Sequence, residues 1–191
     1  MGIVDLTRER LEETVSLLQR VFSYYKYSEE DFKASFEIAL GIKSLEEALS
    51  KTEKHPDEIK EAERRLEELR AGVIHSDTYW NYEELTKIAG LIGLTIWKEG
   101  IKTREVWLGW FCVDPEFRGR KIGSILLDYA IDKAKELEFK KLLLLTTDLP
   151  QENAAQVLYE SRGLKVYSRL KGFRTSKIGR DYNTLYRAMD L

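Results

Sequence analysis

The sequence predicts an α/β fold with a mixed, mostly antiparallel central sheet and helices on both faces. Segments rich in β-branched and aromatic residues follow one another closely at residues 79–83, 88–97 and 104–113, as paired antiparallel strands do. The last of these segments, 104–113, is followed by a helical repeat at 122–137 and a second apolar run at 142–145. That order is typical of two parallel strands joined by a crossover helix.

The N-terminal part predicts one strand and two helices. An apolar run at residues 3–6 ends at Thr7, whose hydroxyl is suited to cap a helix with one apolar face. Acidic residues at 29–31 mark the first turn of a second helix, which we expect to end near Leu40.

Residues 41–71 change to charged, helix-forming composition, with a break at His55-Pro56. Their apolar residues recur at helical spacing and are Ile59, Ala62, Leu66 and Leu69. We interpret this stretch as a helical hairpin inserted into a single domain over residues 1–191. Its role as a lid, a dimer contact or extra packing stays open, and a homodimer is one expectation.

The remaining elements are bounded by turn residues. A tight turn is expected at residues 98–100, and Pro115 ends the central strand because proline has no N–H for the ladder. A last helix near 153–161 stops at Gly163. Two strands, near 164–170 and 183–189, complete the chain.

The composition excludes several classes of function. The 191 residues carry a net charge of −2, so no general basic field attracts nucleic acid or an anionic membrane. Cys112 is the only cysteine and there are two histidines, which argues against a disulfide or a clustered zinc site. Without an apolar leader or membrane span, we expect a metal-free cytoplasmic protein.

The turn at residues 118–124 carries the clearest chemistry. It joins a buried strand to a helix and contains two glycines and three basic residues. Backbone N–H groups at a helix start lack intrahelical partners and carry the positive end of the helix dipole, so they bind anions. The sequence predicts a phosphate site formed by Arg118, Gly119, Arg120, Lys121, Ile122, Gly123 and Ser124.

In this turn and the residues just before it, Val113, Pro115, Arg118 and Gly123 match the signature of the GNAT superfamily of acyl-CoA-dependent N-acyltransferases, which the sequence resembles. Lys121 stands where the family usually has a glycine. A positive φ there would cost lysine about 1 kcal/mol. We expect ordinary helical dihedral angles instead, with the ammonium group adding to phosphate binding.

A second segment, residues 153–164, resembles another block of the same superfamily, from Asn153 through Leu158-Tyr159 to Gly163. Gln156 replaces the usual alanine and Leu164 the usual phenylalanine. The two blocks occur in the expected order with a helix and a strand between them. That agreement is harder to reach by accident than either block alone.

The resemblance implies a GNAT-like fold and direct transfer of an acetyl group from acetyl-CoA, the cosubstrate, to a primary amine of a small molecule or peptide. The thioester would lie where strands 107–113 and 142–147 splay apart. Besides the phosphate turn and Asn153, the cofactor would contact backbone groups of Phe111, Cys112 and Val113, one of whose N–H groups would stabilise the developing oxyanion.

Tyr159 is the candidate general acid for the departing thiolate, because its place in the second block matches that role; the alternative is a tyrosine that packs the helix onto the sheet. Glu105 is a weak candidate base, as is Glu83 on the neighbouring strand. A nucleophilic role for Cys112 needs an activating partner that the sequence does not place beside it, so we expect a buried, inert thiol.

The acceptor remains open at this point. Tyr24, Tyr25 and Tyr27 with the acidic residues 29–31 suit a cationic amine. The basic residues Lys171, Arg174, Lys177 and Arg180 suit an acceptor that carries a carboxylate. A catalytically silent acyl-CoA-binding module that regulates a partner is the alternative function.

Overall fold

The computed structural model describes residues 1–25, 27, 29–41, 74–171 and 182–191. The helical hairpin expected at 41–71 lies outside these residues apart from Gly41, so it stays a prediction. Among the described helices, none is long and apolar enough to cross a membrane.

The described strands form one mixed sheet. They are β1 (Gly2–Asp5), β2 (Ile74–Glu84), β3 (Lys87–Trp97), β4 (Glu105–Leu108), β5 (Cys112–Val113), β6 (Lys141–Thr147), β7 (Lys165–Lys171) and β8 (Asn183–Asp190). Their order is β1-β2-β3-β4-β6-β8-β7, with β5 paired to β3. Neighbours run antiparallel except β4 and β6, which are parallel. The mostly antiparallel sheet with one parallel pair is confirmed.

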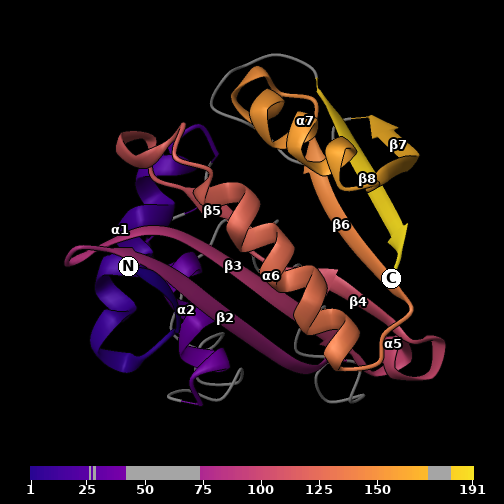
Figure 1. The fold of residues 1–191 in the computed structure, drawn as a ribbon, viewed down its shortest axis with the longest axis horizontal. Coiled ribbons are helices and arrows are strands. Elements are labelled where there is room, and N and C mark those ends of the chain that lie inside the picture. Colours follow the sequence, from indigo (N-terminus) through magenta and orange to yellow (C-terminus); the bar gives the residue numbers. More distant parts are fainter. Residues whose placement is uncertain (26, 28, 42–73, 172–181) are drawn as a thin grey trace, which may run out of the picture.

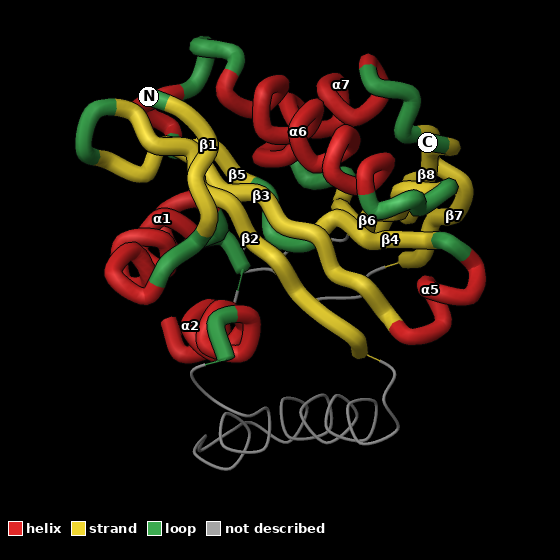
Figure 2. The backbone as a smooth tube through the Cα atoms, turned by 60° about the horizontal axis from the view of Figure 1, so that its bottom comes forward, coloured by secondary structure: helices red, strands yellow, loops and turns green. Residues whose placement is uncertain are grey.

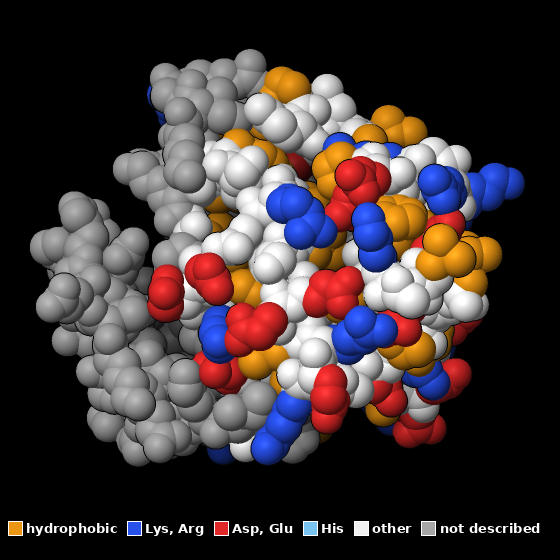
Figure 3. Space-filling model, turned by 90° about the vertical axis from the view of Figure 1, so that its left-hand side faces the viewer, with side chains coloured by type: hydrophobic (Ala, Val, Ile, Leu, Met, Phe, Trp, Pro, Cys, Tyr) orange, Lys and Arg blue, Asp and Glu red, His pale blue; other side chains and the backbone are white. Residues whose placement is uncertain are grey.

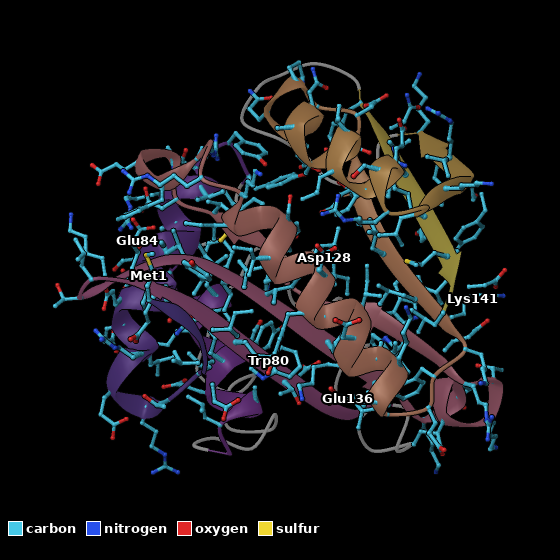
Figure 4. The ribbon with its side chains drawn as sticks, in the orientation of Figure 1. Met1, Trp80, Glu84, Asp128, Glu136 and Lys141 are labelled. Carbon is cyan, nitrogen blue, oxygen red and sulfur yellow. The ribbon has the colours of Figure 1, made fainter. Side chains whose placement is uncertain are left out.

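Helices cover both faces of this sheet, as expected (Figure 2). They are α1 (Leu11–Val21), α2 (Glu29–Ala39), α5 (Lys98–Thr103), α6 (Ile122–Glu136) and α7 (Asn153–Ser161). Alternation along β2 divides its side chains between two cores. Trp80 and Tyr82 pack on the α6 side, whereas Tyr79 packs with α1 and α2. Trp80, labelled in Figure 4, lies near α6. Its ring meets that of Tyr129 on α6 edge-on, with centroids 5.3 Å apart.

Two local expectations were wrong. Thr7 makes no side-chain capping bond, because the chain first takes a 3-10 turn over Arg8–Arg10 and α1 starts only at Leu11. Residues 98–100 form no tight turn but open the short helix α5, which ends where Arg104 takes a positive φ of 57°.

The predicted strand 104–113 is interrupted by a β-bulge. On β3, Leu94 pairs with Leu108 and Leu91 with Cys112, so three residues of this strand stand opposite two of β3. An extra residue of this kind bends a strand and redirects its backbone groups.

The bulge coincides with the end of the parallel pairing. β4 and β6 pair only as far as Trp107 and Leu143, and β5 pairs with β3 alone. The part of the sheet that carries β1 to β5 therefore diverges from the part formed by β6 to β8, and α6 and α7 lie on either side of the opening (Figure 1).

On the face shown in Figure 3, acidic and basic side chains are interspersed rather than gathered by sign. This matches the near balance of charges in the sequence, which has 31 basic and 33 acidic residues.

Candidate active site

The turn between β5 and α6 is shaped by three residues. The Asp114 carboxylate accepts a hydrogen bond of 2.9 Å from the backbone N–H of Glu116 and so starts a 3-10 turn over Pro115–Phe117. Gly119 and Lys121 then take φ values of 79° and 64°, in the left-handed region. Left-handed residues within a turn direct neighbouring N–H groups toward a common point, where an anion can bind.

The start of α6 supplies the donors. The N–H of Ile125 bonds to the carbonyl of Lys121 at 3.0 Å, which is the first bond of the helix. The N–H groups of Ile122, Gly123 and Ser124 precede that bond and have no intrahelical acceptor. All three residues line one cavity. This is the arrangement that an anion such as a phosphate requires.

Lys121 differs from expectation. Its φ of 64° and ψ of 8° are left-handed rather than helical, because the residue is the N-cap of α6 and must reverse the chain into the helix. The position therefore has the geometry that a glycine provides without cost, and lysine occupies it with strain.

We expect Lys121→Gly to be more stable than Lys121→Ala by about 1 kcal/mol in free energy of unfolding, because only alanine keeps the cost of a positive φ. Chemical denaturation of both variants measures the difference. Both lose the ammonium group, so anion binding at the turn should weaken by a similar factor in the two. Equal stabilities would show that the left-handed geometry is absent.

The basic side chains of the turn point in different directions. Arg118 and Lys121 line the cavity, and the Arg118 Nε donates to the carbonyl of Val113 at 3.3 Å. Arg120 is directed away: its Nη1 donates to Glu84 on β2 at 2.5 Å, and its guanidinium lies 5.2 Å from the centre of the Phe117 ring. Its expected role at a phosphate is therefore not supported by the geometry.

The cavity has a volume of about 480 Å³ and occupies the opening between the two parts of the sheet. That volume lies within the range of small-molecule sites. Its walls are the bulged strand at 108–113, the end of β6 at 144–147, the start of α6 at 121–124, and Ala154, Ala155, Leu158 and Tyr159 of α7.

The backbone of β5 presents its polar groups alternately to β3 and to the cavity. Cys112 pairs with Leu91, and the N–H of Asp114 donates to the carbonyl of Ala89 at 2.9 Å. Residues between hydrogen-bonded positions of an antiparallel pair point their N–H and C=O away from the partner strand. Val113 therefore directs its N–H toward β6. The N–H and C=O of Cys112 face β3, although the residue lies in the cavity wall, so its contact with a cofactor stays a prediction.

The Cys112 side chain is buried in the core beneath α1 and α2. Burial, together with the charge of Asp114, raises the pKa of the Cys112 thiol to about 12. At neutral pH the thiol therefore holds its proton, as expected of an inert cysteine.

We expect the thiol of the folded protein to react with an aromatic disulfide reagent at pH 8 about a thousandfold more slowly than an exposed thiol, since a pKa shift of about three units removes that fraction of thiolate. Because Cys112 is the only cysteine, the same protein in guanidinium chloride is the matched control and should react rapidly. Rapid stoichiometric reaction of the folded protein would contradict the burial and the raised pKa.

Tyr159 lies on α7, 6% exposed, with its ring centroid 6.1 Å from that of Phe111. It lines the cavity opposite the strand that carries Val113. Burial, reinforced by the charge of Glu152, raises the pKa of Tyr159. The hydroxyl therefore remains a proton donor over the accessible pH range.

Two other predicted residues lie elsewhere. Glu105 is at the far end of β4, where its carboxylate accepts bonds from Thr103 at 3.1 Å and from Lys141 at 3.5 Å. Lys141 marks that end of the sheet in Figure 4. Asn153 is the exposed first residue of α7. Neither residue is part of the cavity wall.

Glu152 was missed by the sequence analysis. It belongs to a 3-10 turn, Pro150–Glu152, that follows β6, and it lines the cavity. The Glu152 carboxylate accepts hydrogen bonds from Tyr24 and Tyr25. An acidic residue in the turn between a strand end and a helix start was the available signal.

Of the residues expected to bind the acceptor, some line the cavity and others do not. Tyr24 and Tyr25 line the cavity, together with Phe22 and Trp110. Tyr27 packs edge-on against Trp110, with centroids 5.3 Å apart. The acidic residues 29–31 are not part of the cavity wall, and the basic residues expected at 174, 177 and 180 lie outside the described residues.

Comparison with known proteins agrees with this architecture. The chain superposes on an N-acetyltransferase from Staphylococcus aureus Mu50 with a TM-score of 0.66 at 15% identity, covering 98% of this chain and 96% of that one. It superposes on the ribosomal-protein-S18-alanine N-acetyltransferase from Escherichia coli with a TM-score of 0.66 at 17% identity, covering 100% and 94%. No curated protein matches the sequence. Residues 42–164 match the family model described as Acetyltransferase (GNAT) family, which spans more than half of the chain. The chain therefore belongs to the GNAT acetyltransferase family.

Proposed function

We propose that this protein transfers an acetyl group from acetyl-CoA directly to a primary amine of a small molecule or peptide. The observation that carries the proposal is the shared cavity: the free N–H groups of α6, the inward N–H of Val113 and the buried Tyr159 all belong to it. Phosphate donors, an oxyanion donor and a proton donor are the three groups that transfer from a thioester requires.

The residues of the turn fit the diphosphate of CoA. Ile122, Gly123 and Ser124 present unpaired N–H groups, and Arg118 and Lys121 supply positive charge at the same wall. The pantetheine arm would follow the opening between β5 and β6.

Acetyl-CoA supplies the thioester, and the residues of this chain position it and move one proton. The N–H of Val113 would stabilise negative charge that develops on the thioester oxygen as the amine nitrogen attacks. The new C–N bond forms and the C–S bond breaks, while the Tyr159 hydroxyl donates its proton to the departing sulfur. The nitrogen, which becomes positively charged on attack, releases one proton to solvent, and the Tyr159 phenolate takes a proton back from solvent.

Two observations support transfer without an acyl-enzyme. The pKa of Cys112 is raised to about 12, so this thiol is a poor nucleophile at neutral pH. Its side chain also packs into the core on the α1 and α2 side of the sheet.

The amine is expected to react in its neutral form. Among the described residues of the cavity wall, Glu152 is the acidic one, and its oxygens are already hydrogen-bonded. The kcat/KM for the amine should therefore rise with pH, about tenfold per unit, until the pH reaches the pKa of the amine itself.

Acetyl-CoA turnover against a panel of amines tests the proposal, with thiol release as the readout. The panel should contain a polyamine, free amino acids and a peptide with an N-terminal alanine, since the Escherichia coli neighbour is named for an alanine acceptor. Calorimetric binding of CoA without turnover on any amine would favour a silent acyl-CoA-binding module. Absence of CoA binding would overturn both functions.

A further inference from the structure

A buried arginine lies behind the cavity and does not line it. Arg187 of β8 is 2% exposed, and its guanidinium donates three hydrogen bonds, one of them in an ion pair with Glu160. Nε donates to Gln156 at 2.9 Å, Nη1 to the carbonyl of Leu164 at 2.7 Å, and Nη2 to Glu160 at 2.9 Å. A buried charge is costly, and an apolar side chain of the same volume usually stabilises a fold at least as well. Stability alone therefore does not explain an arginine here.

The arginine determines the orientation of Gln156. Because a guanidinium can only donate, the amide oxygen of Gln156 must face Arg187 and its NH₂ must face β6. That NH₂ donates to the Thr146 hydroxyl at 2.9 Å and to the carbonyl of Thr147 at 2.8 Å. Gln156 is one of the two positions at which the second block departs from the superfamily pattern, and this is its role in the structure.

The direction of donation continues into the cavity. Since the oxygen of Thr146 accepts from Gln156, its proton is free to donate to Glu152 Oε2, 2.6 Å away. The donors thus run in one direction from Arg187 through Gln156 and Thr146 to the Glu152 carboxylate. Hydrogen bonds aligned in this way polarise and strengthen one another.

Glu152 links the end of β6 to the segment that follows α1. On one side its Oε2 accepts from the hydroxyl of Thr146 and, at 2.9 Å, from the N–H of Thr147 on β6. On the other side its Oε1 accepts from Tyr25 at 2.6 Å and Tyr24 at 3.3 Å, which follow α1. Four donors fill the acceptor positions of one carboxylate. Glu152 is thereby suited to hold the two tyrosines at the cavity wall, not to take a proton.

We propose that Arg187 and Gln156 are positioning residues that fix Glu152 and, through it, the Tyr24 and Tyr25 wall against which the acceptor amine binds. The inference rests on the proposed function, because it assigns that wall to the acceptor. The phosphate turn lies at the start of α6 and shares no hydrogen bond with this chain of donors among the described residues.

Gln156→Glu tests the chain of donors with almost no change of shape. A carboxylate still accepts from Arg187 but cannot donate to Thr146 or Thr147. We expect the KM for the acceptor to rise about tenfold and the KM for acetyl-CoA to stay within twofold. Thr146→Val should reproduce the effect one link further on, whereas Thr146→Ser, which keeps the hydroxyl, should restore a KM near that of the wild type.

Glu160→Gln is the matched control. It removes the charge partner of Arg187 on the exposed side, since Glu160 is 65% exposed in its side chain, and leaves the path to the cavity intact. Its kinetic constants should stay within twofold of the wild type. A similar rise in both KM values for Gln156→Glu, or no change in either, would overturn the positioning role.

Failure of the positioning role can be distinguished from failure of the proposed function. If the wild-type protein acetylates no amine, the proposed function fails. The hydrogen-bond network from Arg187 to Glu152 is then tested by thermal unfolding of Gln156→Glu, Tyr25→Phe and the double variant. Linked residues should give non-additive shifts in Tm, because residues within one hydrogen-bond network couple. Additive shifts would overturn the inference as well.

Discussion

Tyr159→Phe is expected to lower kcat about a hundredfold, the lower end of what a general acid contributes. The phenyl ring keeps the packing against Phe111, so the fold should be unchanged. The KM for acetyl-CoA should stay within twofold of the wild type. Only the proton donor is removed. Steady-state thiol release at saturating amine measures the change, and calorimetry checks that CoA still binds.

Tyr129→Phe is the matched control. Tyr129 is a tyrosine on α6 that packs against Trp80, away from the cavity. Loss of its hydroxyl should leave kcat within twofold. If Tyr159→Phe also stays within twofold while CoA binding is unchanged, Tyr159 only packs α7 onto the sheet.

The raised pKa of Tyr159 has a definite sign in a pH profile. Burial, with the charge of Glu152, makes the folded protein hold this proton beyond the ordinary tyrosine pKa of about 10. The rate should therefore not fall between pH 8 and 10 through loss of the acid. The free energy of unfolding that this tyrosine contributes is present below pH 10 and is lost as the pH rises above that value. Tyr159→Phe should flatten the corresponding slope in a denaturation series.

Much of the fold was predictable because its signals are local. The bounds of α7, Asn153–Ser161, follow from a helical repeat that ends before Gly163, whose φ of 85° no other residue adopts as easily. The order of strand, helix and strand around α6 likewise determined the parallel pair.

The β-bulge was not predictable, because residues 107–113 are apolar on both faces and their pattern conceals a one-residue change of register. The left-handed Lys121 escaped prediction for a related reason. Its φ is imposed by the way the chain must enter α6, and the residue type gives no sign of it.

The candidate site likewise contains parts that local sequence predicts and parts that it does not. The phosphate turn was predictable since its donors are backbone groups of adjacent residues. Glu152 and Arg187 were not, because their partners are distant in the sequence: Tyr25 precedes Glu152 by 127 positions, and Gln156 precedes Arg187 by 31. Only the fold brings such groups together; the acidic residue between a strand end and a helix start marks the position of Glu152 but not its partners.

Gly123→Val is expected to raise the KM for acetyl-CoA about a hundredfold, equivalent to about 2.7 kcal/mol of binding free energy. A Cβ at Gly123 would lie 3.4 Å from Leu158, 3.6 Å from Val113 and 3.7 Å from Phe111, which are ordinary contact distances. The protein can therefore hold the side chain. These neighbours lie on both sides of the opening, however, so the added atoms would occupy the space that a phosphate needs to approach the start of α6.

Gly123→Ala separates this effect from damage to the fold. Alanine in a helix is more stable than glycine by about 0.5 to 1 kcal/mol, so the free energy of unfolding without ligand should rise or stay unchanged. The KM for acetyl-CoA should nevertheless rise about tenfold, since a single methyl already restricts the approach to the N–H groups of Gly123 and Ser124. Stability and cofactor binding thus move in opposite directions at one position, a result that global destabilisation cannot produce. An unchanged KM in both variants would place the phosphates away from this turn.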